Sequence, residues 1–226
     1  MSIGARVKEV QDRVARAEQS SGRKAGSVRL VAVCKKISAD LVREAYHEGL
    51  RDFAENYVQE ALLKMAALND LDIHWHMIGH LQTNKVKSIS NRFSLIQSVD
   101  SEKLLEEIEK RSEKTQEILV EVNLGDEDTK SGLSAHELKA LLQKVQLQKR
   151  VVARGLMFMP PMDLSVIEQA QYFERARELR ERMLREISAP HNLDDLSMGT
   201  SHDFEVAIQE GATIVRLGTA IFGPRS

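Results

Sequence analysis

Cysteine is nearly absent from this chain of 226 residues, because Cys34 is the only one. A single thiol excludes an internal disulfide framework and is typical of a reducing compartment, so we expect a cytoplasmic protein. Long apolar runs are also missing: no stretch of the sequence approaches the roughly 18 apolar residues of a membrane helix. The charged segment 1–23 lacks the apolar core of a secretion signal. We therefore expect no membrane association and no export.

An excess of either charge is lacking too. The chain has 32 Lys and Arg against 34 Asp and Glu, for a net charge of −2. Nucleic acids and anionic membranes attract clustered positive charge, so this balance argues against both and favours a small molecule or a protein as partner. The charged run RARELRERMLRE, residues 175–186, mixes acids and bases at helical spacing, as a solvated helix face does.

Two kinds of segment alternate along the chain. Short runs rich in Val, Ile and Leu predict eight strands, at Val28–Cys34, Asp52–Asn56, Ile73–Gly79, Leu95–Asp100, Ile118–Leu124, Val152–Met159, Leu193–Met198 and Thr213–Phe222. Helical periodicity predicts helices at Gly4–Glu18, Asp40–Glu48, Val58–Leu68, Glu102–Lys114, Ala135–Val145, Ile167–Ile187 and Asp203–Glu210. The candidate N-caps are Ser38, Ser101, Ser134 and Ser165.

This alternation predicts parallel strands joined by crossover helices, and eight such units close into a (β/α)₈ TIM barrel. An open doubly wound sheet is the alternative. No Gly-x-Gly-x-x-Gly follows the first strand and no linker-like change of composition divides the chain, which favours one barrel domain over residues 1–226. We expect the extra N-terminal helix, residues 4–18, to cover the barrel where a final helix would otherwise pack.

The first strand ends directly on Lys35 and Lys36. Barrels carry their chemistry at this rim, and side chains alternate along a strand, so we expect one lysine to enter the mouth while the other faces outward. Burial lowers the pKa of an ammonium group and yields a nucleophilic amine, which forms Schiff bases with carbonyl compounds such as pyridoxal phosphate. Two solvated loop cations are the alternative.

The seventh and eighth strands end in turns suited to a phosphate. Gly199, Thr200 and Ser201 precede a helical run, and Gly218-Thr219 ends the next strand in the same style. Barrels commonly hold a phosphate at these strands with backbone N–H groups, although a Ser-capped turn is the alternative.

Arg216 lies within an apolar run. Pointing inward, it would keep a pyridine nitrogen unprotonated; pointing outward, it would be a solvated cation.

Several motifs together resemble one family. The motifs are AVCK (32–35), FAENYVQE (53–60), HWHMIGHLQTNK (74–85), KSG (130–132), RGLM (154–157), LSMGTSHDFEVAI (196–208) and VRLGTAIFG (215–223). In this order they resemble the pyridoxal phosphate homeostasis proteins, which are similar to the N-terminal barrel of alanine racemase. The resemblance implies a fold-type III barrel in which Lys35 holds pyridoxal 5'-phosphate as a Schiff base. The other residues that it implies for the cofactor are Ser201, Gly218 and Thr219 at the phosphate, Arg216 at the ring nitrogen, and Asn56 and His80 in the pocket.

The resemblance also implies a function in vitamin B6 homeostasis. Such a protein holds pyridoxal phosphate and buffers it or supplies it to apoenzymes, as a monomer and without enzymatic turnover. Cys34, Ala54 and the pair Ile37-Ser38 depart from the residues that the family commonly has at these places.

An amino-acid racemase with Lys35 as base is the alternative function. Racemisation needs a second acid or base on the opposite face of the substrate. In the racemases that resemble this barrel, that group is a tyrosine from a second domain, and we expect no such domain here. Of the three tyrosines, only Tyr57 falls near the predicted rim.

A metal-dependent hydrolase is a third hypothesis, because His74 and His76 would lie on one face of a strand. Core packing of the two rings is the alternative. No further set of His and Asp stands at the other strand ends in an obvious pattern, so we expect no metal site.

Overall fold

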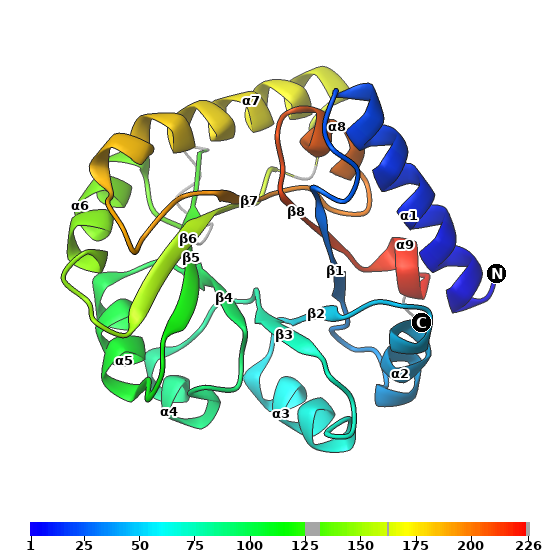
Figure 1. Ribbon diagram of the computed structural model, residues 1–226, viewed down its shortest axis with the longest axis horizontal. Coiled ribbons are helices and arrows are strands. Elements are labelled where there is room, and N and C mark those ends of the chain that lie inside the picture. Colours follow the sequence, from blue (N-terminus) through cyan, green and yellow to red (C-terminus); the bar gives the residue numbers. More distant parts are fainter. Residues whose placement is uncertain (125–131, 162, 225–226) are drawn as a thin grey trace.

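A closed barrel of parallel strands forms the centre of the molecule (Figure 1). The computed structural model describes residues 1–124, 132–161 and 163–224. Over these residues the strands are β1 (Arg29–Val33), β2 (Asp52–Glu55), β3 (His74–Met77), β4 (Leu95–Val99), β5 (Gln116–Val122), β6 (Val151–Phe158), β7 (Asp195–Ser197) and β8 (Ile214–Leu217). Each strand pairs with its neighbours in sequence order, and β8 returns to β1 with Arg29 opposite Ile214. The predicted (β/α)₈ barrel is confirmed.

Helices surround the barrel; those from α2 to α8 connect consecutive strands, whereas α1 precedes β1 and α9 follows β8 (Figure 1). They are α1 (Ile3–Ser20), α2 (Ala39–His47), α3 (Val58–Ala67), α4 (Val86–Ile89), α5 (Glu102–Arg111), α6 (Ala135–Val145), α7 (Val166–Met183), α8 (Phe204–Gln209) and α9 (Thr219–Phe222), with short 3₁₀ turns at Thr83–Lys85 and Leu184–Glu186. The predicted N-caps are confirmed: Ser38, Ser101, Ser134 and Ser165 each accept a hydrogen bond from a backbone N–H in the first helical turn.

The helix α1 packs against α8 and α9, beside the seam where β8 meets β1 (Figure 1). Its apolar face is buried through residues such as Val7 and Val10. Arg13 donates two hydrogen bonds to the carboxylate of Glu205 on α8, at 3.0 and 2.8 Å. This confirms that the N-terminal helix covers the barrel at the position of a final helix.

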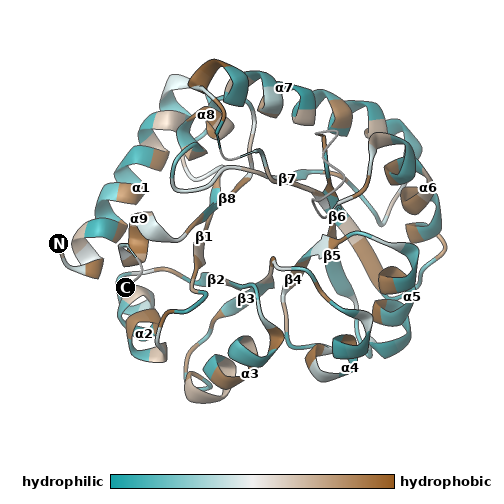
Figure 2. Ribbon diagram, turned by 180° about the vertical axis from the view of Figure 1, so that it is seen from behind, coloured by the Kyte–Doolittle hydropathy of each residue, from teal (hydrophilic) through white to brown (hydrophobic). Residues whose placement is uncertain are grey.

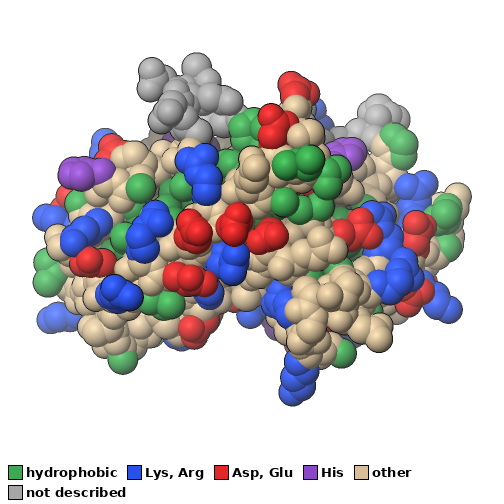
Figure 3. Space-filling view, turned by 90° about the horizontal axis from the view of Figure 1, so that it is seen from above, with side chains coloured by type: hydrophobic (Ala, Val, Ile, Leu, Met, Phe, Trp, Pro, Cys, Tyr) green, Lys and Arg blue, Asp and Glu red, His purple; other side chains and the backbone are tan. Residues whose placement is uncertain are grey.

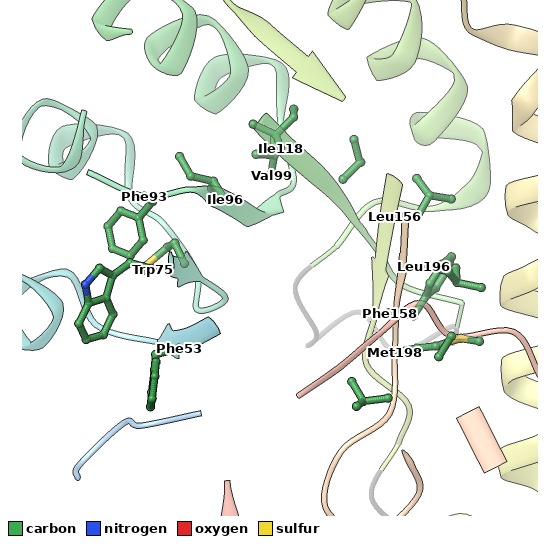
Figure 4. Packing of buried hydrophobic residues seen from close by; sticks show 14 of the residues in the cluster. Phe53, Trp75, Phe93, Ile96, Val99, Ile118, Leu156, Phe158, Leu196 and Met198 are labelled. Atoms are coloured by element: carbon green, nitrogen blue, oxygen red, sulfur yellow. The ribbon is translucent and has the colours of Figure 1, made fainter. Parts of the chain in front are cut away.

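The apolar core has two parts. The larger part lies between the strands and the helices, where Phe53, Trp75 and Phe93 gather on one side of the barrel (Figure 4). The smaller part fills the barrel interior with aliphatic side chains: Val31, Val33, Ala54, Ile78, Leu95, Leu119, Met157 and Ile214. The helices are largely hydrophilic on the sides that face solvent (Figure 2), and Figure 3 shows basic and acidic side chains interspersed on one face. Among the described residues, no helix combines the length and apolarity needed to span a membrane.

Several predicted boundaries differ from the structure by a few residues, and two of these differences bear on the barrel mouth. The last strand was expected over Thr213–Phe222, but β8 ends at Leu217 and α9 begins at Thr219. The apolar run TAIF is too short for its periodicity to separate strand from helix. The first strand ends at Val33 rather than at Cys34, which places both lysines in a turn.

Candidate functional site

A cavity of about 260 Å³ opens at the end of the barrel where the strands terminate. Its lining comes from residues at or just beyond the carboxyl ends of β1, β2, β3, β6, β7 and β8: Val33, Lys35, Asn56, Ile78, Met159, Thr200, Ser201, His202, Arg216, Gly218 and Thr219. The structure thus brings together Lys35, Asn56, Ser201, Arg216, Gly218 and Thr219 from the predicted set. The predicted residue His80 is not part of this lining.

Lys35 and Lys36 are separated by a turn rather than by strand alternation. Lys35 is half-buried in the cavity wall, whereas Lys36 is exposed. The backbone of Lys36 has a φ of 61°, a left-handed conformation that is uncommon for residues other than glycine. The prediction that only one lysine enters the mouth is therefore met by Lys35, but the strand argument for it was wrong.

The turns after β7 and β8 are joined by Ser201. Its Oγ accepts hydrogen bonds from the backbone N–H groups of Gly218 and Ala220, both at 3.2 Å. Thr200 is occupied within its own turn, because its N–H and hydroxyl donate to Asp203 Oδ1 at 2.5 and 2.9 Å. The hydroxyls of Ser201 and Thr219 and the start of α9 therefore form one wall of the cavity.

Gly199 allows this wall to approach the helix behind it. Its φ of +92° is left-handed, and a Cβ there would lie 2.7 Å from the Cβ of Ala207 and 3.0 Å from the Cα of Phe204. Any other residue would both strain the backbone and push α8 away from β7.

Arg216 points into the barrel and forms the floor of the cavity. Its side chain is buried, with Nη1 donating to Ser197 Oγ at 2.6 Å and Nη2 donating to the Phe158 carbonyl at 2.9 Å. Burial lowers the pKa of Arg216 to about 10, while the charges of Glu121 and Asp203 oppose this change. The guanidinium therefore stays charged at neutral pH, and the interpretation of Arg216 as an outward cation is wrong.

A chain of hydrogen bonds, which we call the barrel chain, runs from Arg216 through the interior. Ser197 Oγ donates to Gln97 Oε1 at 2.6 Å, Gln97 Nε2 donates to His76 Nδ1 at 2.9 Å, and His76 Nε2 lies 3.0 Å from Asp52 Oδ1. Because Nδ1 accepts, the ring proton of His76 must sit on Nε2 and point at Asp52. Burial lowers the pKa of His76, which favours this neutral form.

Sequence reasoning missed Gln97 and Ser197. Their signal was present as polar residues inside the strand runs LIQSV and DLS. A polar side chain in a buried strand requires a hydrogen-bond partner. Only the barrel geometry shows that the partners come from different strands.

Both His74 and His76 lie beside the carboxylate of Asp52. His74 Nδ1 lies 3.5 Å and His76 Nε2 lies 3.0 Å from the same carboxylate oxygen. Within the described ranges, no group of three or more His, Cys, Asp or Glu side chains is arranged to hold a metal ion. The metal-hydrolase hypothesis therefore finds no ligand set in this part of the chain.

His80 lies on a neighbouring hollow of about 400 Å³ that it shares with Gln82 and Asp100. Its side chain is mostly exposed, and Nδ1 lies 3.2 Å from Asp100 Oδ2. Glu121, on β5, is buried near Asp100 and His80, and the charges of these two groups influence its pKa. Burial, with the charge of Asp100, raises the pKa of Glu121 to about 7, while Arg216 and His80 lower it. Sequence reasoning did not single out Glu121.

Asn56 presents a buried amide oxygen at the cavity wall. Among the described residues, its Oδ1 has no hydrogen-bond partner. Gly79 packs against the backbone of Asn56 so closely that a Cβ at this position would collide with the Asn56 carbonyl. A buried acceptor held in this way is suited to a ligand that brings a donor. Of the KSG motif, Lys130 and Ser131 lie outside the described residues.

Comparison with known proteins assigns this barrel to a class and then to a family. Residues 7–226 match the family model described as alanine racemase, N-terminal domain. A pyridoxal phosphate homeostasis protein of Aquifex aeolicus is 44% identical over an alignment of 230 positions, which covers 100% of this chain and 99% of that protein. The chain belongs to the pyridoxal phosphate homeostasis protein family.

Solved structures agree with this assignment. The structure of PipY of Synechococcus elongatus with pyridoxal phosphate bound superimposes with a TM-score of 0.83 at 36% identity, covering 93% of this chain and 100% of that chain. Alanine racemase of Corynebacterium glutamicum gives a TM-score of 0.70 at 13% identity, covering 97% of this chain and 61% of that chain. The latter likeness shows a shared barrel fold.

Proposed function

We propose that the protein binds pyridoxal 5'-phosphate in the cavity at the barrel mouth and serves in its homeostasis, as the names of its relatives indicate. The observation that carries the proposal is the meeting of Lys35, the inward-pointing Arg216 and the hydroxyls of Ser201 and Thr219 around one cavity. At about 260 Å³, this cavity is close to the lower end of ligand sites, which span about 300–1,000 Å³.

The residues present fit the cofactor. Pyridoxal phosphate supplies an aldehyde, which condenses with a primary amine with loss of water, and Lys35 supplies the amine. The hydroxyls of Ser201 and Thr219, which line the cavity, are suited to donate to the phosphate. Arg216 is a donor for the ring nitrogen, and the unpartnered Oδ1 of Asn56 is an acceptor for a ligand hydroxyl.

The role we propose is that of a carrier, which buffers the aldehyde and supplies it to apoenzymes, as a monomer in the cytoplasm. Arg216 remains charged in its buried position and would keep a pyridine nitrogen unprotonated. This weakens the ring as an electron sink, so substrate protons next to the bound amine are poorly activated. This arrangement suits a carrier, because the bound cofactor does not react with amino acids in the cell.

The attachment point can be tested by borohydride reduction and peptide mapping of the protein loaded with pyridoxal phosphate. We expect the pyridoxyl mass on Lys35 and not on Lys36, and no visible-absorbing complex in the Lys35→Ala variant. A pyridoxyl group on Lys36, or on neither residue, would refute the assignment.

The phosphate wall can be tested by comparing pyridoxal phosphate with pyridoxal. Thr219→Val removes one hydroxyl, and the loss of a hydrogen bond to a charged group costs about 1.5–3 kcal/mol, or roughly 10- to 150-fold in affinity. The affinity for pyridoxal should change much less. Ser201→Ala should show the same preference, together with a looser turn, because Ser201 Oγ also holds Gly218 and Ala220. Equal losses for both ligands would place these hydroxyls away from the phosphate.

Amino-acid racemisation is the alternative function, and His202 is the observation that favours it. This exposed histidine lines the cavity and could act as the second acid, whereas Tyr57 is absent from the described lining. The test is exchange of the α-proton of L-alanine in heavy water, followed by NMR. We expect no more than slow exchange without inversion. Multiple turnovers per minute, abolished by both Lys35→Ala and His202→Ala, would establish a racemase instead.

A further inference from the structure

Both peptide groups that flank Lys35 are held by one cluster of charged side chains outside the barrel wall. The cluster consists of Glu55, Glu60 and Lys64, and we call it the Lys64 cluster. On one side of Lys35, the Cys34 carbonyl accepts a hydrogen bond from Lys64 Nζ at 2.5 Å. On the other side, the Lys36 N–H donates to Glu60 Oε1 at 2.5 Å.

The cluster is closed on itself. Lys64 Nζ lies 2.5 Å from Glu55 Oε1 and 2.6 Å from Glu60 Oε1. Together with the bond to the Cys34 carbonyl, these contacts use all three N–H groups of the ammonium. Glu55 is fully buried and Lys64 nearly so, while Glu60 is one-quarter exposed. The ammonium is thus fixed in position by its partners and has little freedom to move.

Stability alone is a poor explanation for this cluster. Removing two charges from water costs free energy that their attraction repays only in part, so apolar residues of similar volume often serve a core equally well. The position of the cluster suggests a different role. The turn between β1 and α2 contains the left-handed residue Lys36, and the Lys64 cluster holds it at two points.

We propose that Glu55, Glu60 and Lys64 are positioning residues that set the backbone of Lys35 and so aim its amine into the cavity. The two flanking peptide planes determine φ and ψ of Lys35, and these determine the direction of its Cα–Cβ bond. The inference rests on the proposed function, because aiming matters only if Lys35 must meet an aldehyde. The class of ligand that depends on the cluster is therefore one with a carbonyl carbon.

The side chain of Cys34 lies on the same outer side of the barrel wall as the Lys64 cluster. Its Sγ lies 3.2 Å from Glu55 Oε1 and 3.3 Å from the Ala54 carbonyl. Burial, and then the charge of Glu55, raises the pKa of Cys34 well above its ordinary value. The side chain therefore remains a thiol, which donates to Glu55 and does not compete with Lys35 as a nucleophile.

The test is Lys64→Met, which keeps the apolar stem and removes the ammonium, with Lys144→Met as the matched control. Lys144 pairs with Glu102 on the surface, far along the chain from the turn. Each protein is mixed in its ligand-free form with pyridoxal phosphate, and the pyridoxyl group trapped on Lys35 by borohydride is measured against time. Binding of pyridoxine 5'-phosphate, which has an alcohol in place of the aldehyde, is measured in parallel.

We expect Lys64→Met to trap the aldehyde at least tenfold more slowly, with affinity for pyridoxine phosphate changed less than threefold. The pH at which the visible absorbance changes should also shift, whereas Lys144→Met should match the wild type in every measurement. Trapping at the wild-type rate, or an equal loss of both ligands, would overturn the proposal. If the wild type itself shows no pyridoxyl group on Lys35, the proposed function fails and the positioning role fails with it.

Glu60→Ala provides a second variant if Lys64→Met does not fold. It removes the acceptor of the Lys36 N–H and leaves the contact between Lys64 and Glu55 in place. We expect it to slow trapping on Lys35 at least threefold, again with little change in pyridoxine phosphate binding. A wild-type rate in this variant would also overturn the proposal.

Discussion

Replacing Gln97 by leucine tests whether the barrel chain contributes to folding. The side-chain amide of Gln97 is fully buried and links Ser197 to His76. Leucine has nearly the same size but no polar atoms, so the change leaves the Ser197 O–H without its acceptor and His76 Nδ1 without its donor, while Ser197 Oγ still accepts from Arg216. Each orphaned group costs about 1–3 kcal/mol, and the added apolar burial returns about 1 kcal/mol. For two orphaned groups, we expect a net loss of about 1–5 kcal/mol in the free energy of unfolding.

A double-mutant cycle makes the prediction specific to the chain. Ser197→Ala alone orphans Arg216 Nη1 and Gln97 Oε1. The two single variants together orphan four groups. The double variant contains neither the Ser197 hydroxyl nor the Gln97 amide, so only two orphaned groups remain, Arg216 Nη1 and His76 Nδ1. Its cost should therefore fall below the sum by about 2 kcal/mol.

The measurement is urea unfolding followed by the fluorescence of Trp75, the only tryptophan, which is buried and contacts the ring of Phe53. Gln148→Leu is the control, because Gln148 is only half-buried and, among the described residues, its side chain bonds to a single backbone carbonyl, that of Lys144 at the end of α6. A Gln97→Leu variant within about 0.5 kcal/mol of the wild type would refute the reasoning. Strict additivity in the cycle would show that the bonds act independently.

Three further predictions concern stability. Glu121 has a pKa raised in the folded state, so its favourable contribution is present below pH 4.5 and is lost as the pH rises through about 7. Glu121→Gln cannot ionise, and its free energy of unfolding relative to the ligand-free wild type should rise by about 3 kcal/mol between pH 4.5 and 8; a constant difference would contradict this. Gly155→Ala would drive a Cβ into the Asp195 carbonyl between β6 and β7 and should cost about 3 kcal/mol or more, seen as a lower melting temperature. Ser134→Ala removes the capping box of α6 and should cost about 1 kcal/mol, with faster amide exchange in the first turn of that helix; unchanged exchange would show that the cap is dispensable.

Local signals in the sequence were sufficient for the barrel and for the starts of the helices that a serine caps, but they did not predict the short helix α4. Strands of a parallel barrel are buried on both faces and read as short apolar runs, while a serine before a periodic segment has a direct hydrogen-bonding reason to be an N-cap. Local signals failed at residues 218–222, where the apolar run after Gly218 turns into α9. Four residues are too few for periodicity to distinguish the two structures.

The site was predictable only in part, because its remaining features depend on contacts between distant segments. The direction of Arg216 depends on the register of β8 against β1, which no local pattern specifies. The Lys64 cluster joins the turn after β1 to β2 and α3, and the barrel chain joins β2, β3, β4, β7 and β8. His80 illustrates the same limit, since its motif suggested the pocket but its ring lies beside Asp100.

The packing of α1 has a consequence for the order of folding during synthesis. Arg13 meets Glu205 across 192 positions, and Arg23 meets the Ala212 carbonyl across 189. The ribosome makes α1 long before α8 and α9, so the apolar face of α1 stays uncovered while most of the barrel strands emerge. Contacts of such large sequence separation form late, because loop closure must be completed before they can contribute. The seam between β8 and β1, and with it the wall formed by Ser201 and α9, should therefore be among the last parts of the nascent protein to become ordered.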